Sequence, residues 1–272
     1  MIRDDLGVRM KTFYEQVPKT KLVRRMPVAI RIDGKAFHTF TRGFDKPFDR
    51  ILMRAMQETM KYLCENIQGC VFGYTQSDEI SLILVDYKKL NSSAWFDYEV
   101  QKMCSISASM ATIAFNKAFT KLANICINTI MDVWNVSDGD KGHMMKYMKT
   151  LDNAMAKGAI FDSRCFNIPV EEVTNLIYWR QLDAIRNSVQ MVGQASFSQK
   201  QLQGKSCGDI KDMLVNIGDA WENYPIAAQR GSACIKEDDE WIIDIYMPIL
   251  KGENREYLDK YVRYSTYYEG NE

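Results

Sequence analysis

Apolar and polar positions alternate in residues 27–33, which read PVAIRID. The apolar side chains would share one face and Arg31 and Asp33 the other, as is typical of a half-buried strand. Two short apolar runs, residues 70–75 and 80–85, are separated by four polar residues. This second pattern predicts a β-hairpin with a polar tip.

Helical periodicity fills the segments between these strands. Apolar side chains recur at helical spacing in residues 48–67, and they predict a helix of about five turns between the first strand and the hairpin. A second helix is predicted over residues 95–122, where many small residues would allow close packing on a sheet. Residues 159–168 then read as a further strand, which stops at Pro169.

This order, β-α-β-β-α-β, predicts an α+β fold of the ferredoxin-like type, in which four antiparallel strands carry two helices on one face. The first strand would lie beside the third, with the second and fourth strands outermost. Residues 135–142 form a polar break, and the Met-rich stretch after them is either an amphipathic helix or an insertion. Three C-terminal elements complete the prediction: helices over residues 169–197 and 209–215, and a strand over residues 241–246 that completes a sheet or covers the core.

Composition narrows the class of protein. Lysine plus arginine total 35 and aspartate plus glutamate total 35, so a basic coat over the whole surface is excluded and any nucleic acid must meet a local patch. The 7 cysteines form no CxxC pair, which favours a reduced, cytoplasmic protein without structural zinc. We find no apolar run long enough to span a membrane, and therefore expect a soluble protein with no membrane partner.

The candidate catalytic residues lie where the first strand ends and where the hairpin turns. Asp33 and Asp78 would come within range of one site, and paired carboxylates suit Mg²⁺, which also binds phosphate oxygens. Glu79 should point to the opposite face of its strand. A glycine-led turn follows Asp33, and its amides could form an anion nest. On spacing alone, the same residues are better explained as ordinary turn formers.

Two stretches of the sequence decide between these interpretations. IRIDGKAFHTFTRGFDKPFD at residues 30–49 and GYTQSDEISLIL at residues 73–84 resemble the two signature segments of the tRNA-His guanylyltransferase family, in particular its bacterial-type members that polymerise in the 3′-to-5′ direction. Further similarity lies at residues 161–169, 178–188 and 202–206, so the resemblance covers about residues 7–215.

The resemblance implies a polymerase-like palm and a nucleotidyltransferase that adds nucleotides to the 5′ end of tRNA. A nucleoside triphosphate, ATP or GTP, would activate the 5′ phosphate, and the 3′-hydroxyl of an incoming nucleotide would then attack it. Two Mg²⁺ ions would be held by Asp33, Asp78 and the carbonyl of Gly34. We predict this catalytic domain over residues 1–168 and a C-terminal extension over residues 169–272, packed on it as one unit.

Matching motif to motif assigns the other site residues by resemblance. Asp49 is the candidate for a contact with the nucleotide base. The triphosphate would be held, beside Asp33 and Asp78, by Gly34, Lys35, Ala36, Phe37, His38, Lys46 and Ser77. The RNA 5′ end would be bound by Arg164, Arg180, Arg186, Asn187 and Lys205, for which a solvated or salt-bridged face is the alternative. Members of the family are typically homotetramers.

One departure from the family pattern bears on the substrate. Eukaryotic members carry a histidine in the long helix, and Ile185 stands at that place here. The departure favours templated repair of 5′-truncated tRNA over addition of one G to tRNA-His. A nucleotide cyclase on the same palm and a non-enzymatic tRNA-binding protein remain the rival hypotheses.

Overall fold

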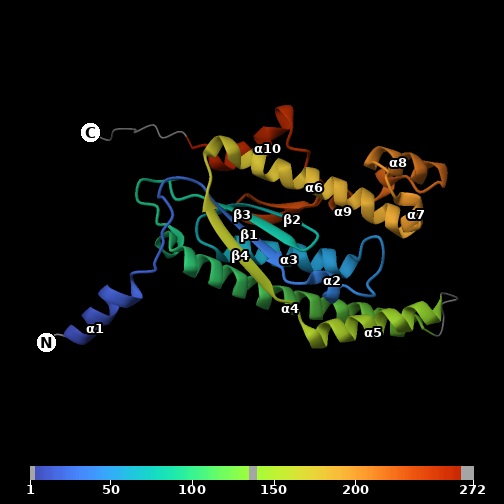
Figure 1. The fold of residues 1–272 in the computed structure, drawn as a ribbon, viewed down its shortest axis with the longest axis horizontal. Coiled ribbons are helices and arrows are strands. Elements are labelled where there is room, and N and C mark those ends of the chain that lie inside the picture. The colour runs from blue at the N-terminus through green and yellow to red at the C-terminus, as the bar shows by residue number, and fades with distance from the viewer. Residues whose placement is uncertain (1–3, 135–139, 265–272) are drawn as a thin grey trace.

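A computed structural model of the chain describes residues 4–134 and 140–264. Within these residues one antiparallel sheet runs in the order β4-β1-β3-β2-β5-β6 (Figure 1). Its strands are β1 (Val28–Gly34), β2 (Cys70–Gln76), β3 (Glu79–Leu84), β4 (Phe161–Asn167), β5 (Ser232–Glu237) and β6 (Glu240–Asp244). The predicted order of the first four strands and the α+β class are therefore correct.

The sheet corrects one expectation about its edges. The second strand was expected to be outermost, but β5 pairs with β2, through partners such as Gly73 and Cys234, and so places β2 inside the sheet. The strand predicted at residues 241–246 is observed as β6 and pairs with β5. It extends the sheet rather than covering the core.

Two helices cover one face of the sheet, α3 (Arg50–Asn66) and α4 (Val100–Val133). The alternate residues Val28, Ile30 and Ile32 of β1 are fully buried against them. The buried positions of α4 recur every four residues and include the small residues Ser107 and Ala111, which lets the helix lie close to the sheet. In Figure 1 both helices lie on the lower side of the sheet, with α5 (Lys141–Lys157) alongside α4.

The boundaries of α4 differ from the prediction at both ends. A 3₁₀ turn over Trp95–Tyr98, with Phe96 and Asp97 at left-handed φ angles, delays the helix to Val100. Its C-terminal half continues to Val133 because the helix packs against α5 there. The Met-rich stretch is thus the amphipathic helix α5. Of the predicted polar break, residues 135–139 lie outside the described residues.

The second face of the sheet is covered by α6 and α10, which lie above it in Figure 1. Helix α6 begins directly after Pro169, as predicted. The helices of this C-terminal part are α6 (Val170–Ser196), α7 (Gln199–Leu202), α8 (Cys207–Asn216), α9 (Ile226–Arg230) and α10 (Glu256–Val262), with 3₁₀ turns at Trp221–Asn223 and Gly252–Arg255. The division at residue 168 stays a prediction, while β5 and β6 share one sheet with the preceding part.

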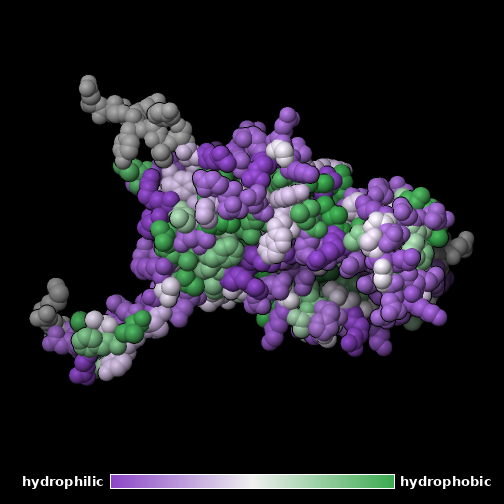
Figure 2. All heavy atoms as spheres, turned by 45° about the horizontal axis from the view of Figure 1, so that its top comes forward, coloured by the Kyte–Doolittle hydropathy of each residue, from purple (hydrophilic) through white to green (hydrophobic). Residues whose placement is uncertain are grey.

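The N-terminal segment projects away from the body as an arm (Figure 1). It consists of α1 (Asp5–Met10) and a π-helical turn over Lys11–Glu15, and neither contains a buried residue. Apolar and polar side chains are mixed along the arm in Figure 2, and Phe13 and Tyr14 are among its exposed apolar residues. Across the described ranges, no helix is long and apolar enough to cross a membrane.

Candidate active site

Asp33 lies near the end of β1, between two other acidic residues. In the sheet register it faces Glu79 on β3 and Asp162 on β4. Its side chain is on the α6 side of the sheet, because the alternate residues Ile30 and Ile32 fill the opposite core. Burial raises the pKa of the Asp33 carboxyl, and the negative charges of Glu79 and Asp162 raise it further.

Asp78 occupies the tip of the hairpin next to the end of β1. Its main-chain carbonyl accepts a hydrogen bond of 3.1 Å from the amide of Gly34. The preceding residue, Ser77, has a left-handed φ of 50° and donates its hydroxyl to Asp78 Oδ1 at 3.0 Å. Burial raises the pKa of the Asp78 carboxyl, the Ser77 hydrogen bond opposes this, and the charge of Asp33 raises it again.

The predicted pair of carboxylates is therefore brought together by the fold. Each acid carries a raised pKa, first because its carboxyl is buried and second because other carboxylates lie nearby. Mg²⁺ prefers hard oxygen donors, and these two carboxylates supply both such oxygens and negative charge. No group of three or more histidine, cysteine or acidic side chains suited to a metal occurs in the described part of the chain. A cation bound by Asp33 and Asp78 thus needs main-chain, water or phosphate oxygens to complete its shell.

The turn after Asp33 exposes its main chain to this site. Ala36 adopts a left-handed conformation with φ 53° and ψ 41°, which is costly for a residue with a Cβ atom. The amide of Lys35 donates to the carbonyl of Ile160 at 2.8 Å. Of the hydrogen bonds found among the described residues, none uses the amides of Ala36, Phe37 or His38. Successive free amides of this kind can bind an anion.

A buried aromatic cluster holds this turn in place. The Phe37 ring lies 5.1 Å from that of Phe40, 5.6 Å from that of Phe115 and 5.2 Å from that of Phe161, centroid to centroid. A Cβ atom on Gly34 would lie only 2.1 Å from the Phe37 ring, so only glycine fits there. The side chain of Phe37 is thus an anchor, whereas Lys35, Ala36 and His38 are exposed beside the site.

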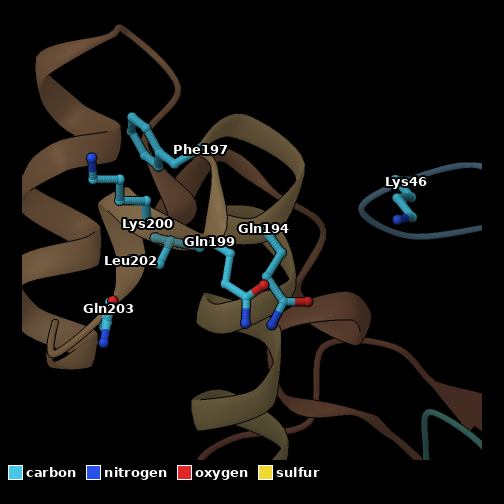
Figure 3. A pocket seen from close by; sticks show the side chains of 7 residues that line it. All are labelled: Lys46, Gln194, Phe197, Gln199, Lys200, Leu202 and Gln203. Carbon is cyan, nitrogen blue, oxygen red and sulfur yellow. The ribbon is translucent and has the colours of Figure 1, made fainter.

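Lys46 lies on the far side of a large cavity from α7 (Figure 3). The cavity has a volume of about 840 Å³, and its opposite wall carries Gln194, Gln199 and Lys200. Amides and lysines are side chains that bind phosphate and sugar groups. The loop that carries Lys46, a predicted triphosphate ligand, and the segment around Lys200 therefore line the same cavity.

A smaller cavity of about 90 Å³ lies between the hairpin tip, α3 and α6. Ser77, Asp49 and Asn187 line it, which brings together three residues that the sequence assigned to separate tasks. The carboxylate of Asp49, however, is occupied. It caps α3 by accepting from the amide of Leu52 at 2.9 Å, and it accepts the hydroxyl of Tyr147 at 2.7 Å.

The residues predicted to bind RNA fall into two groups. Arg164, Arg186 and Lys205 are exposed, and Arg164 lies near enough to Asp33 to lower its pKa. Arg164 also contacts Asp162 at 3.4 Å, and Arg186 pairs with Asp183, so both combine exposure with an ion pair. Arg180 is different, because its side chain is buried. It donates to Glu79 at 2.7 Å and to Asp183 at 2.9 Å, the salt-bridged alternative considered from the sequence.

Glu79 is the important residue that sequence reasoning set aside. It was expected to point away from the site, yet it lies on the same face of the sheet as Asp33 and raises the pKa of that acid. Its buried carboxylate accepts Arg31 at 2.6 Å and Arg180 at 2.7 Å. The alternation along β1 already carried this signal. Arg31 and Asp33 lie on the face of β1 opposite Ile30 and Ile32, and a residue paired in register with Asp33 shares its face.

Comparison with known proteins identifies the family. The sequence model of the family described as tRNAHis guanylyltransferase matches residues 7–169, more than half of the chain. The chain belongs to this family. The tRNA-His guanylyltransferases are nucleotidyltransferases, so the predicted family and the predicted class of enzyme are confirmed.

Relatives of this family are similar over most of the chain. An uncharacterized protein of Acanthamoeba polyphaga mimivirus is 28% identical over 242 residues, which covers 85% of this chain and 77% of the relative. The tRNA(His) guanylyltransferase of Schizosaccharomyces pombe is 24% identical over 251 residues, with 85% and 84% covered.

Solved structures in the tRNA-His guanylyltransferase family share this fold. A bacterial tRNA(His) guanylyltransferase-like protein in complex with ATP superposes with a TM-score of 0.77 and 38% identity, covering 94% of this chain and 99% of that one. A complex of such a protein with GTP gives a TM-score of 0.73, 37% identity, and 95% and 99% coverage. The Saccharomyces cerevisiae enzyme, 19% identical with a TM-score of 0.58, supports the fold alone.

Proposed function

We propose that this protein adds nucleotides in the 3′-to-5′ direction to the 5′ end of tRNA and repairs 5′-truncated acceptor strands on a template. The observation that carries the proposal is the placement of Asp33 and Asp78 beside the free amides of residues 36–38. Paired acids next to an anion-binding turn are what phosphoryl transfer on a triphosphate needs. The complexes of bacterial relatives with ATP and GTP support the use of either nucleotide.

In the proposed mechanism the two acids and the turn have separate tasks. Asp33, Asp78 and the carbonyl of Gly34 would hold two Mg²⁺ ions, which supply charge stabilisation for in-line displacement at phosphorus. The amides of residues 36–38 would bind the triphosphate, with Lys35 and Lys46 adding positive charge. The cluster around Phe37 holds this turn rigid, so its donors are pre-oriented toward the phosphates.

The reaction proposed has two displacements. First, the 5′-monophosphate of the RNA attacks the α-phosphorus of ATP or GTP, and pyrophosphate leaves. The 3′-hydroxyl of an incoming nucleoside triphosphate then attacks the activated 5′ phosphorus, and the nucleoside monophosphate leaves. Arg164 and Arg186, both exposed on the α6 side of the site, would bind phosphates of the RNA strand. Ile185, where eukaryotic members have histidine, favours templated repair over G addition to tRNA-His.

An extension assay tests this proposal. Purified protein is given Mg²⁺, all four nucleoside triphosphates and 3′-labelled tRNA lacking its first nucleotide, with a 5′-monophosphate or, as a control, a 5′-hydroxyl. We expect extension of the monophosphate RNA only, by the nucleotide complementary to the opposite strand. Exchanging that opposite nucleotide should exchange the one added, and Asp33→Asn or Asp78→Asn should abolish extension.

Other outcomes of this assay point to the rival functions. If full-length tRNA-His supplied in a parallel reaction were the only RNA extended, by G whatever the opposite nucleotide, the activity would be G addition. Triphosphate consumed without RNA, with release of a cyclic nucleotide, would mean a cyclase. RNA bound but neither substrate changed would leave a tRNA-binding protein.

We also propose that the protein forms a homotetramer in a reducing, cytoplasmic setting. The exposed apolar side chains of the arm, such as Phe13, and of α4, such as Ile113 and Ile125, support contacts between copies. All 7 cysteines are free thiols, which supports a reducing compartment. Light scattering coupled to size exclusion would test the number of subunits, and a monomeric mass would contradict it.

A further inference from the structure

Trp179 presents a large aromatic surface next to the acidic site. It lies on α6, and 52% of it is exposed. The guanidinium carbon of Arg31 lies 5.4 Å from its ring centroid, and that of Arg180 lies 4.6 Å away. Both arginines bind the same buried carboxylate of Glu79, so they support the ring from the side of the sheet.

The position of this ring relative to the catalytic acids follows from the strand. Arg31 and Asp33 are two residues apart on one face of β1, a separation of about 6.6 Å. Arg31 is paired in register with Arg164 of β4, whose side chain is exposed. The exposed indole therefore lies within one or two nucleotide lengths of Asp33, and the exposed Arg164, which contacts Asp162 at 3.4 Å, lies beside it.

Helix α6 continues this surface toward its C-terminus. Leu182 follows Trp179 by three residues and Arg186 by seven, a spacing that puts all three on one side of the helix. Leu182 is 46% exposed, and the Arg186 side chain is 62% exposed. An apolar surface that carries cations at its edge fits the flat end of a base-paired stem, which is apolar on its face and anionic around its rim.

We propose that Trp179 stacks on the terminal base pair at the 5′ end of the RNA acceptor stem, and that it thereby positions the 5′ phosphate at Asp33 and Asp78. This inference rests on the proposed function, whose site it deepens. The pairing of Arg31 and Arg180 with Glu79 makes the ring a rigid platform, so little rotamer entropy is lost when a base pair stacks on it. Trp179 is a positioning residue, because the proposal gives it no contact with the reacting phosphorus.

A double-mutant cycle tests the stacking directly. The equilibrium affinity for a 5′-phosphorylated acceptor-stem hairpin is measured by fluorescence anisotropy in Ca²⁺, beside the same hairpin with an abasic terminal pair. We expect Trp179→Ala to weaken binding of the intact hairpin about tenfold and to leave binding of the abasic hairpin unchanged. Trp179→Phe should restore most of the affinity. Tyr246→Ala, which removes an aromatic side chain that is 70% exposed, should change neither affinity.

The outcomes separate this inference from the proposed function. Equal loss of affinity for both hairpins in Trp179→Ala, or no loss for either, overturns the stacking. In the extension assay the same substitution should raise KM for RNA about tenfold while KM for ATP stays unchanged. The unfolding temperatures of Trp179→Ala and Trp179→Phe are compared, to detect a structural effect of losing the ring. A ring with a purely structural role would change the affinity for the intact and the abasic stem alike. If Trp179→Ala weakened binding of the intact hairpin only, but the wild-type protein extended no 5′ end, the stacking by Trp179 would be upheld and the proposed reaction rejected.

Discussion

The amide of Gly34 donates a hydrogen bond of 3.1 Å to the main-chain carbonyl of Asp78. This contact joins the end of β1 to the tip of the β2–β3 hairpin without using either acidic side chain. The separation of Asp33 and Asp78 is therefore set by the backbone. Substitution of either carboxylate by its amide should leave the site geometry in place, so the loss of chemistry can be separated from the loss of fold.

The first prediction concerns Gly34. Gly34→Ala places a methyl group 2.1 Å from the Phe37 ring, which is packed among Phe40, Phe115 and Phe161. We expect the overpacked turn to cost about 1–3 kcal/mol in the free energy of unfolding and to abolish ATP binding. Urea unfolding and titration calorimetry measure the two effects.

Gly208→Ala is the matched control for this substitution. A Cβ atom at Gly208, in α8, meets only the Ser206 hydroxyl at 3.6 Å. In the first turn of α8 the change should be neutral or stabilise by up to about 0.5–1 kcal/mol. Unchanged ATP affinity in Gly34→Ala would contradict the assignment of this turn to the triphosphate.

The second prediction is a dependence of stability on pH. The pKa of Asp78 is raised above its ordinary value of 3.8 by burial and by the charge of Asp33. The folded protein therefore holds this proton to higher pH than the unfolded chain, and the free energy of unfolding should fall as pH rises from 3.8 through the raised pKa. In EDTA, Asp78→Asn should remove part of this fall and be more stable than wild type at pH 7 by about 1 kcal/mol.

Thermal unfolding between about pH 4 and about pH 8 measures this difference. Asp152→Asn, at an exposed position on α5, controls for the loss of one negative charge. Mg²⁺ with ATP should stabilise wild type and leave Asp78→Asn unaffected. A wild-type protein as stable in EDTA at pH 7 as the amide variant would argue against repulsion between the two acids.

The third prediction separates a buried arginine from an exposed one. Arg180→Met removes the buried cation that Glu79 and Asp183 share, which leaves them only the more exposed Arg31 and Arg186, and we expect it to cost about 3 kcal/mol in urea unfolding. Arg186→Met removes an exposed side chain, and we expect stability to change by less than about 0.5 kcal/mol while RNA affinity falls. If Arg180→Met instead kept its stability and lost RNA affinity, Arg180 would be a direct RNA ligand.

The fourth prediction concerns the task of Asp49. Because its carboxylate caps α3 and accepts the Tyr147 hydroxyl, Asp49→Ala should lower the free energy of unfolding by about 2 kcal/mol. Tyr147→Phe removes only the second contact and should cost about half as much. The ratio of ATP to GTP affinity should stay the same in both variants. If that ratio changed in Asp49→Ala but not in Tyr147→Phe, Asp49 would be a contact to the nucleotide base after all.

Local patterns were sufficient for much of this molecule. The alternation in residues 27–33 predicted which face of β1 is buried, and the hairpin signal placed Asp78 at a tip. The order of elements then predicted β4-β1-β3-β2, since a ferredoxin-like chain allows few other pairings. The two signature segments predicted the family. Each of these inferences depends on neighbours in the chain or on a short literal motif, which a sequence displays directly.

Contacts between distant segments were decided only by the tertiary structure. Pairing of β5 with β2 depends on a long C-terminal connection that leaves no local signal. The burial of Arg180 on Glu79 and of Asp49 on Tyr147 depends on where α6 and α5 dock, so side chains predicted to bind RNA and a base also make buried structural contacts. Trp179 was unremarkable in the helical pattern. Its exposure near Asp33 exists because α6 crosses the face of the sheet that carries Arg31, Asp33 and Glu79, where the arginines that hold the ring also neutralise a buried acid.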